Sequence, residues 1–139
     1  MDWTSLVSTC IRADEENAYS RSDIKTLAGA KHMINHPTTS GNYPLHFVAL
    51  GRNVSLAEWL LDNGGAFYTN QDYQTPLHWA CRAGYLPMVS LFLQHMTPNQ
   101  ITFQDEEGNS ALDWAREYEH EDIINLLNEF ATHMYNNKR

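Results

Sequence analysis

The sequence has few cysteines and few basic residues. Its 139 residues include two cysteines, Cys10 and Cys81, and nine lysines and arginines against seventeen aspartates and glutamates. Two cysteines are too few for the disulfide framework of a small secreted domain, and Cys81 stands where packing is expected. A net charge of −8 argues against non-specific nucleic-acid binding, which needs basic side chains to displace counterions. We therefore expect a reducing compartment and no nucleic-acid partner.

Long apolar runs are also absent. No segment approaches the roughly 18 apolar residues of a membrane helix, and residues 1–4 lack the basic start of a secretion signal. The composition, 42% hydrophobic and 19% charged, is typical of a globular chain. The sequence predicts a single soluble domain, monomeric when alone, without membrane insertion, in the cytoplasm or the nucleus.

The histidines, cysteines and serines do not form a recognisable catalytic or metal site. His78 and Cys81 are three residues apart, but no Cys-x-x-Cys pair supplies the further ligands that zinc needs. No serine lies in a Gly-x-Ser-x-Gly motif, and Gly64-Gly65 lacks the lysine and the spacing of a phosphate-binding loop. We therefore expect no catalytic residues, no metal, no cofactor and no enzymatic activity.

An internal repeat is the strongest pattern in the chain. The segment that begins Thr75-Pro76-Leu77-His78 has a counterpart 32 residues earlier, Tyr43-Pro44-Leu45-His46, and another 35 residues later, Ser110-Ala111-Leu112-Asp113. Apolar residues follow each copy at matching positions: Trp59 and Leu60, Leu91 and Phe92, Leu126 and Leu127. We expect the leucines and the phenylalanine of this stripe to lie in the core (Leu60, Leu61, Leu91, Phe92, Leu126 and Leu127). Three copies in register indicate a repeat protein.

Each copy predicts two short helices joined by a tight turn. Thr75 is a good N-cap and Pro76 suits the first helical position. Gly84 can take the left-handed conformation that ends a helix, and Pro87 suits a second start. Because one such pair cannot bury its own apolar stripe, the copies must stack on one another.

This pattern resembles the ankyrin repeat, most closely at Thr75-Pro76-Leu77-His78 with Ala80 and Gly84, and the resemblance covers roughly residues 38–130. It implies an all-α, ankyrin-type helical solenoid of about four antiparallel helix pairs with projecting turns. Two positions depart from the family pattern. Tyr43 replaces a capping threonine, and Tyr73 replaces the turn glycine of the other copies, so we expect the middle turn to differ in shape.

The boundaries follow from the copies. We predict one ankyrin-repeat domain over residues 1–139, with a degenerate N-terminal helical cap at 1–37, repeats at 38–69, 70–104 and 105–135, and a tail at 136–139. The cap is expected to hold an amphipathic helix from about Trp3 to Asp14 and a second helix after Ser22. The extra residues 95–100 are expected to form a surface loop, and the last helical pair to end near residue 130.

His46 and His78 hold the same place in successive copies. Neighbouring helices pack about 8–10 Å apart, which is too far for the two imidazoles to share an ion. The resemblance implies instead that both rings form hydrogen bonds that order the adjoining turns, with Asp113 at this place in the third copy. For the aromatic residues that follow (Phe47, Trp79 and Trp114), we expect core packing and not a ligand site.

The resemblance also implies a function, a non-catalytic protein-binding module or adaptor that uses the turns and the exposed positions of the first helices. Carried onto this sequence, the contact positions are Asn42, Leu50, Gln71, Asp72, Tyr73, Gln74, Arg82, Glu106, Glu107, Asn109, Glu117 and Tyr118. Residues 105–129 contain nine acidic residues and Arg116 as their one base, so we expect a partner with a basic segment at this end. The alternative is the regulatory or substrate-recruiting portion of a larger enzyme, such as an acyltransferase.

Overall fold

The computed structural model describes residues 34–137, with side chains to residue 133. The helices expected at about residues 3–14 and after Ser22 lie outside the described residues. The described elements are α3 (Pro44–Ala49), α4 (Val54–Asp62), α5 (Pro76–Ala83), α6 (Leu86–His95), α7 (Pro98–Ile101), α8 (Ala111–Glu117) and α9 (Glu121–Asn137). Within this range there is no strand, as predicted, and no helix is long and apolar enough to cross a membrane.

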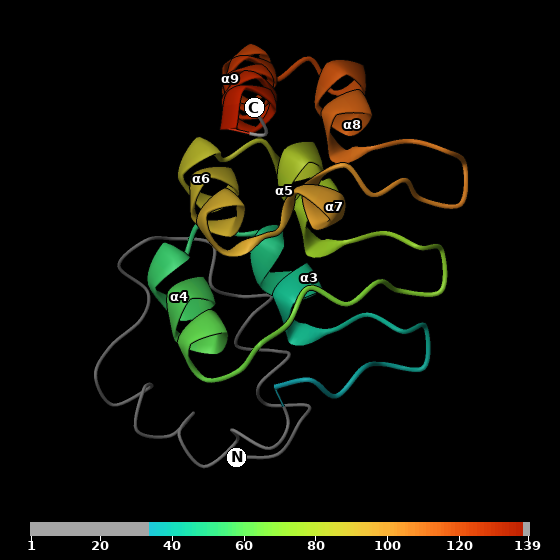
Figure 1. The fold of residues 1–139 in the computed structure, drawn as a ribbon. Helices are drawn as coiled ribbons and strands as arrows, with labels where there is room; N and C mark the ends of the chain where they lie inside the picture. Colours follow the sequence, from blue (N-terminus) through green and yellow to red (C-terminus); the bar gives the residue numbers. More distant parts are fainter. Residues whose placement is uncertain (1–33, 138–139) are drawn as a thin grey trace.

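The helices form two columns. Helices α3, α5 and α8 stack in one column and α4, α6 and α9 in the other, while the three turns that precede the first column project to one side (Figure 1). Helix α5 packs against both α3 and α8, and α6 lies between α4 and α9. This is the stacked arrangement of antiparallel helix pairs that the three copies predict.

The helix ends follow the sequence signals. The Thr75 hydroxyl accepts a hydrogen bond from the His78 amide at 3.3 Å, and Gly84 ends α5 with a φ of +83°. At the start of α3, Tyr43 forms no such side-chain cap. Its own amide donates instead to Nδ1 of His46 at 3.0 Å, so the helix start keeps half of the usual reciprocal capping pattern.

The core lies between the two columns. Its largest buried apolar side chains are Leu45, Val48, Leu56, Leu60, Leu77, Met88, Phe92 and Ile123. Leu61 and Leu126, which the sequence placed in the core, are half-buried at its edge, as are Phe47, Trp79 and Trp114. Cys81 is buried, and burial raises the pKa of its thiol to about 12, so this cysteine is an inert packing residue.

The middle turn does not differ in shape, so that prediction is wrong. Tyr73 has a φ of +58°, close to +80° at Gly41 and +81° at Gly108. Each turn closes with the same pair of backbone hydrogen bonds; in the middle turn Asn70 N donates to Gln74 O at 3.0 Å and Tyr73 N to Asn70 O at 3.1 Å. The backbone hydrogen bonds therefore hold a tyrosine in the left-handed conformation that its glycine counterparts adopt freely.

The residues between the second and third copies do not form the predicted surface loop. They include α7, whose cap is reciprocal, because the Thr97 hydroxyl accepts from the Gln100 amide at 3.2 Å and the Gln100 side chain accepts from the Thr97 amide at 2.9 Å. Met96, before this short helix, and Ile101, its last residue, are buried and attach it to the core. The sequence contains the signal for this helix start, because Thr97 precedes Pro98 and Gln100 follows three residues after Thr97.

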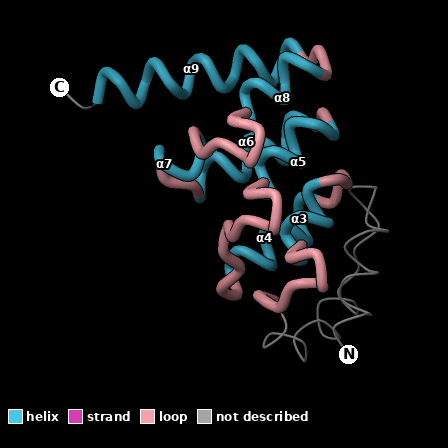
Figure 2. The backbone as a smooth tube through the Cα atoms, turned by 90° about the vertical axis from the view of Figure 1, so that its right-hand side faces the viewer, coloured by secondary structure: helices cyan, strands magenta, loops and turns pink. Residues whose placement is uncertain are grey.

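Helix α9 continues to Asn137, past the predicted end near residue 130 and into the predicted tail. No glycine or proline occurs after residue 120, so nothing in this stretch terminates the helix. Figure 2 shows that its C-terminal half extends beyond the other helices.

Candidate binding face on the projecting turns

The three projecting turns stack edge to edge. Glu106 N donates to Asp72 O at 2.9 Å, which joins the third turn to the second, and Gln71 N donates to Ser40 O at 3.4 Å, which joins the second to the first. The Gln71 side chain adds a bond of 2.8 Å to Thr39 O. These bonds make one continuous edge from three separate turns.

Two buried histidines fix this edge to the helices behind it. Nε2 of His46 lies 2.9 Å from Gln74 O, and Nε2 of His78 lies 2.9 Å from Asn109 O, one repeat further along in each case. Each Nδ1 accepts an amide hydrogen at 3.0 Å, from Tyr43 and Thr75 respectively, so Nε2 must carry the proton and donate. The expectation that these rings order the adjoining turns is confirmed.

Both rings are neutral at neutral pH. Burial lowers the pKa of His46 to about 4, although the hydrogen bond to Gln74 acts in the opposite direction. Burial also lowers the pKa of His78, against the raising effect of the Asn109 bond and of the Asp105 charge. With their hydrogen bonds to Gln74 O and Asn109 O, both histidines therefore serve as neutral hydrogen-bond bridges.

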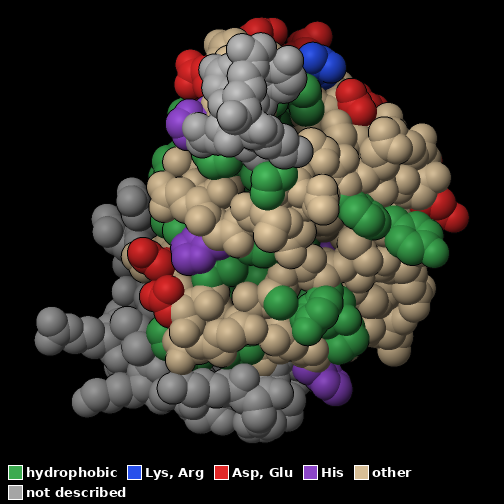
Figure 3. All heavy atoms as spheres, in the orientation of Figure 1, with side chains coloured by type: hydrophobic (Ala, Val, Ile, Leu, Met, Phe, Trp, Pro, Cys, Tyr) green, Lys and Arg blue, Asp and Glu red, His purple; other side chains and the backbone are tan. Residues whose placement is uncertain are grey.

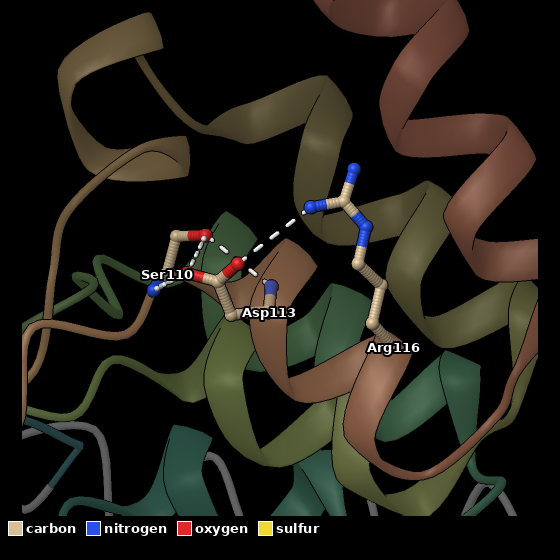
Figure 4. Close-up of polar contacts among 3 residues, drawn as sticks. All are labelled: Ser110, Asp113 and Arg116. Carbon is tan, nitrogen blue, oxygen red and sulfur yellow. Dashed lines mark hydrogen bonds and ion pairs between the residues drawn. The ribbon is translucent and has the colours of Figure 1, made fainter.

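Asp113 takes the histidine position in the third copy and works only within its own helix start. Its Oδ2 accepts from the Ser110 amide at 3.0 Å and from the Ser110 hydroxyl at 3.2 Å, and its Oδ1 lies 3.7 Å from the Arg116 guanidinium (Figure 4). An ionised carboxylate accepts but does not donate, so Asp113 cannot reach a neighbouring carbonyl as the histidines do.

Asp105 organises the third turn from within. Its Oδ1 accepts from the amides of Glu107 at 3.0 Å and Asn109 at 2.8 Å, and its Oδ2 accepts from Nε1 of Trp114 at 2.9 Å. Burial raises the pKa of Asp105, but these hydrogen bonds and the nearby His78 outweigh it, and the net pKa is lowered. Asn70 holds the second turn in the same way through the amides of Asp72 and Gln74. The Asp105 carboxylate is thus already engaged and is not free for a partner.

A hollow of about 340 Å³ opens between the second and third turns and α8. Its walls are Asp72, Gln74, Asp105, Glu106, Glu107, Asn109, Trp114, Glu117 and Tyr118. All of these except Asp105 and Trp114 were predicted contact residues. Comparison of the three copies could have identified Trp114, because this residue lies in the first turn of α8, directly after the third projecting turn. Its apolar side chain led instead to an assignment to the core.

The other predicted contact residues lie outside this hollow. The Asn42 side chain accepts a hydrogen bond from the Asn70 side chain at 3.0 Å and so links the first turn to the second. Gln71 and Leu50 are exposed, on the second turn and at the end of α3. Tyr73, at 55%, is the most exposed large hydrophobic residue among those whose side chains the structure describes. The guanidinium of Arg82 lies 5.7 Å above the ring of Tyr118, at the rim of the hollow.

Most carboxylates of the hollow have no basic side chain paired with them. Those of Asp72, Glu106, Glu107 and Glu117 are exposed, and within residues 34–133 none of them has a hydrogen-bond or ion-pair partner. In that range the Arg116 pair with Asp113 is the one ion pair. Figure 3 shows several acidic side chains at the end of the stack that holds α8 and α9, with a basic side chain among them. This end of the stack therefore carries a local negative field.

The comparisons with known proteins agree with the geometry. The chain matches the family model of ankyrin repeats in three copies over residues 13–100 and 45–137. It is 31% identical to mouse palmitoyltransferase ZDHHC13 over 104 residues, which are 73% of this chain and 16% of that protein. It is 34% identical to chicken NF-kappa-B inhibitor alpha over 89 residues, 63% of this chain and 28% of that protein. A Drosophila melanogaster channel, transient receptor potential cation channel subfamily A member 1, is 30% identical over 70% of this chain and 8% of its own length. The chain thus spans less than a third of each of these relatives.

Proposed function

The chain belongs to the ankyrin repeat family, whose repeats generally mediate protein–protein interactions, and we propose that it is a non-catalytic module that binds a partner protein through its projecting turns. The partner carries a basic segment that docks at the second and third turns. The observation that carries this proposal is the hollow between those turns, whose exposed carboxylates have no partner in the described part of the chain.

Electrostatics favour such a partner. Four unpaired carboxylates on two adjacent turns and on α8 attract a positively charged segment over a distance of about 10 Å at 0.1 M salt. The same field repels nucleic acid, whose phosphates carry the same sign of charge. The expected signature is therefore fast association that slows as salt is added.

The rim of the hollow supplies groups that suit a protein interface. Tyr73 and Tyr118 expose large aromatic surfaces, and Arg82 lies over the Tyr118 ring. Tyrosine and arginine are enriched among the residues that contribute most to binding energy at protein interfaces. Tyr118 lines the hollow and Tyr73 follows Asp72, another lining residue, in the sequence, so these tyrosines add apolar contact area to the charge of the face.

The environments of the reactive side chains support the non-catalytic part of this proposal. His46 and His78 are buried neutral bridges, and the Cys81 thiol has a raised pKa. Asp105, the one buried carboxylate that the hollow contains, is occupied by three hydrogen bonds. None of these groups has a free proton-transfer or nucleophilic partner, which a catalytic role needs.

A second candidate is the regulatory or substrate-recruiting portion of a larger enzyme. The match to the palmitoyltransferase favours it, because this chain corresponds to a minor part of that protein. The binding face would then recruit a substrate or hold a regulatory segment. The length of the native reading frame separates the two candidates, since a frame that continues into a catalytic domain supports the second.

The proposal is tested by capturing bound proteins from the native cell. The wild-type chain is compared with Arg82→Ala/Tyr118→Ala, which removes the pair at the rim, and with Glu58→Gln, an exposed change on the outer helix α4. We expect a specific set of proteins to be lost with the rim variant and kept with the control. Identical capture by all three would refute the proposed face, provided that the unfolding midpoints also agree.

A further inference from the structure

Tyr73 occupies a strained backbone position, and its side chain forms no hydrogen bond, ring contact or cation contact with the other described residues. The equivalent residues in the other turns are Gly41 and Gly108, all three have positive φ, and all three turns form the same hydrogen bonds. A glycine at residue 73 would therefore form the same turn without the steric penalty of a side chain in the left-handed region. The tyrosine side chain is 55% exposed, so packing does not explain its presence either. A strained, exposed aromatic residue of this kind points to recognition.

The other described tyrosine side chains all have aromatic or cationic partners. Tyr43 and Tyr68 pack against each other with ring centroids 4.9 Å apart. The guanidinium of Arg52 lies 5.1 Å above the ring of Tyr85, and that of Arg82 lies 5.7 Å above the ring of Tyr118. Among the tyrosines of residues 34–133, Tyr73 is the one whose ring has no other ring or cation against it. An arginine side chain thus lies over a tyrosine ring in two successive repeats, whereas the ring of Tyr73 has no such partner.

The surroundings of Tyr73 select a cation for that open ring. Asp72 and Gln74 on either side of it line the hollow, and the bond from Glu106 N to Asp72 O holds the third turn against the second. The carboxylates of Asp72 and Glu106 have no partner among the described residues. A group that stacks on the ring and also meets these carboxylates must be both flat and positively charged. A guanidinium has both properties, whereas an ammonium is compact and strongly hydrated.

We propose that Tyr73 is the aromatic anchor of the binding face and that it receives an arginine side chain of the partner, stacked on its ring and neutralised by the carboxylates of the adjacent hollow. The proposal rests on the proposed function and specifies the partner segment as one that contains arginine in an extended stretch. The proposal also implies that Tyr73 lowers the stability of the free chain, and that binding of the partner's arginine offsets this loss.

The test uses three short synthetic peptides of alternating serine and a second residue, which is arginine, lysine or neutral citrulline. Their affinities are measured for the wild-type chain, for Tyr73→Gly and for Phe103→Ala, which removes an exposed aromatic ring elsewhere on the surface. We expect wild type to prefer the arginine peptide over lysine and to bind citrulline least. Tyr73→Gly should weaken arginine binding about two- to fivefold and abolish the preference over lysine. The same variant should raise the unfolding midpoint, and Phe103→Ala should leave the peptide preference unchanged.

For a binding residue, Tyr73→Gly should lower the affinity for the arginine peptide and raise the unfolding midpoint. For a structural residue, the same variant should lower the unfolding midpoint. A lower unfolding midpoint for Tyr73→Gly, or unchanged arginine binding, overturns the proposal. Absence of binding to the arginine peptide overturns it as well. Equal affinity of wild type for the arginine and lysine peptides overturns the stacking on Tyr73 but leaves the proposed function intact, because charge alone then carries the interaction. The proposed function fails separately, in the capture experiment.

Discussion

His78 donates a hydrogen bond of 2.9 Å from Nε2 to the carbonyl oxygen of Asn109, and so helix α5 of one repeat holds the turn of the next. Asn109 lines the hollow, next to the turn residues that carry its carboxylates. The geometry of the hollow therefore depends on a buried neutral imidazole in the preceding repeat. His46 and Gln74 repeat the relationship one step earlier.

Stability should fall as the pH drops below neutrality. The pKa of His46 is about 4 in the folded chain and 6.5 for an unperturbed histidine. Above pH 6.5 both states are neutral at this ring, and between pH 6.5 and 4 the unfolded chain binds a proton that the folded chain does not. The free energy of unfolding should decrease by about 3 kcal/mol across this window, and His78 should add to the loss because its pKa is also lowered. Urea unfolding at a series of pH values measures this.

His46→Gln is the informative variant for this pH dependence. It should lower stability at neutral pH and reduce the slope between pH 6.5 and 4. His95→Gln, an exposed change at the end of α6, is the matched control and should keep the wild-type slope. An unchanged slope in His46→Gln would show that another group carries the pH dependence.

Gly84→Ala should destabilise the chain more than Gly64→Ala. Both glycines have positive φ, +83° and +97°, so alanine costs about 1–2 kcal/mol of backbone strain at either position. At residue 64 a Cβ would meet nothing within 4 Å, but at residue 84 it would lie 2.6 Å from Nε2 of His120. That nitrogen is 3.0 Å from Arg82 O, so moving the ring away loses a hydrogen bond of about 1 kcal/mol. Chemical unfolding of the two variants gives the comparison, and equal losses would mean that His120 adjusts freely.

Leu77→Ala should create a cavity at the centre of the stack. Leu77 is fully buried on α5, the helix that contacts both α3 and α8. The expected loss is about 2–5 kcal/mol, whereas Leu50→Ala at a site 49% exposed should change stability by about 0.5 kcal/mol or less. If Leu77→Ala unfolds at the same denaturant concentration as Leu50→Ala, the packing described between the helix columns is incorrect.

Much of the fold could be predicted because local signals and the repeat agree. Thr75, Pro76 and Gly84 mark the ends of α5 by backbone chemistry alone, and three copies in register fix how the helix pairs stack. The shape of the middle turn was predicted wrongly. The sequence shows only that a tyrosine is unfavourable at positive φ, while the hydrogen bonds of Asn70 and the neighbouring turns supply the energy that holds it there.

The position of most residues that line the hollow was predictable, but the hydrogen bonding of each was not. The family resemblance assigned contact positions to the second and third turns, where the hollow lies, yet it could not separate the engaged carboxylate of Asp105 from the unpaired ones of Glu106 and Glu107. Whether a carboxylate is engaged depends on where the chain places the amides of residues 107 and 109 and the indole of Trp114. That placement is a property of the folded turn.

If the proposed function is correct, the unpaired carboxylates of the turns guide a basic partner to this face. Once a partner has been captured, its association rate should be measured for the wild-type chain and for Glu106→Gln/Glu107→Gln at two salt concentrations, about 0.1 M and 1 M, where the screening length falls from about 10 Å to about 3 Å. We predict that the variant associates more slowly than wild type at low salt, and that the two rates converge at high salt. Equal rates and an equal salt dependence would contradict the account and leave the acidic turns without a part in binding.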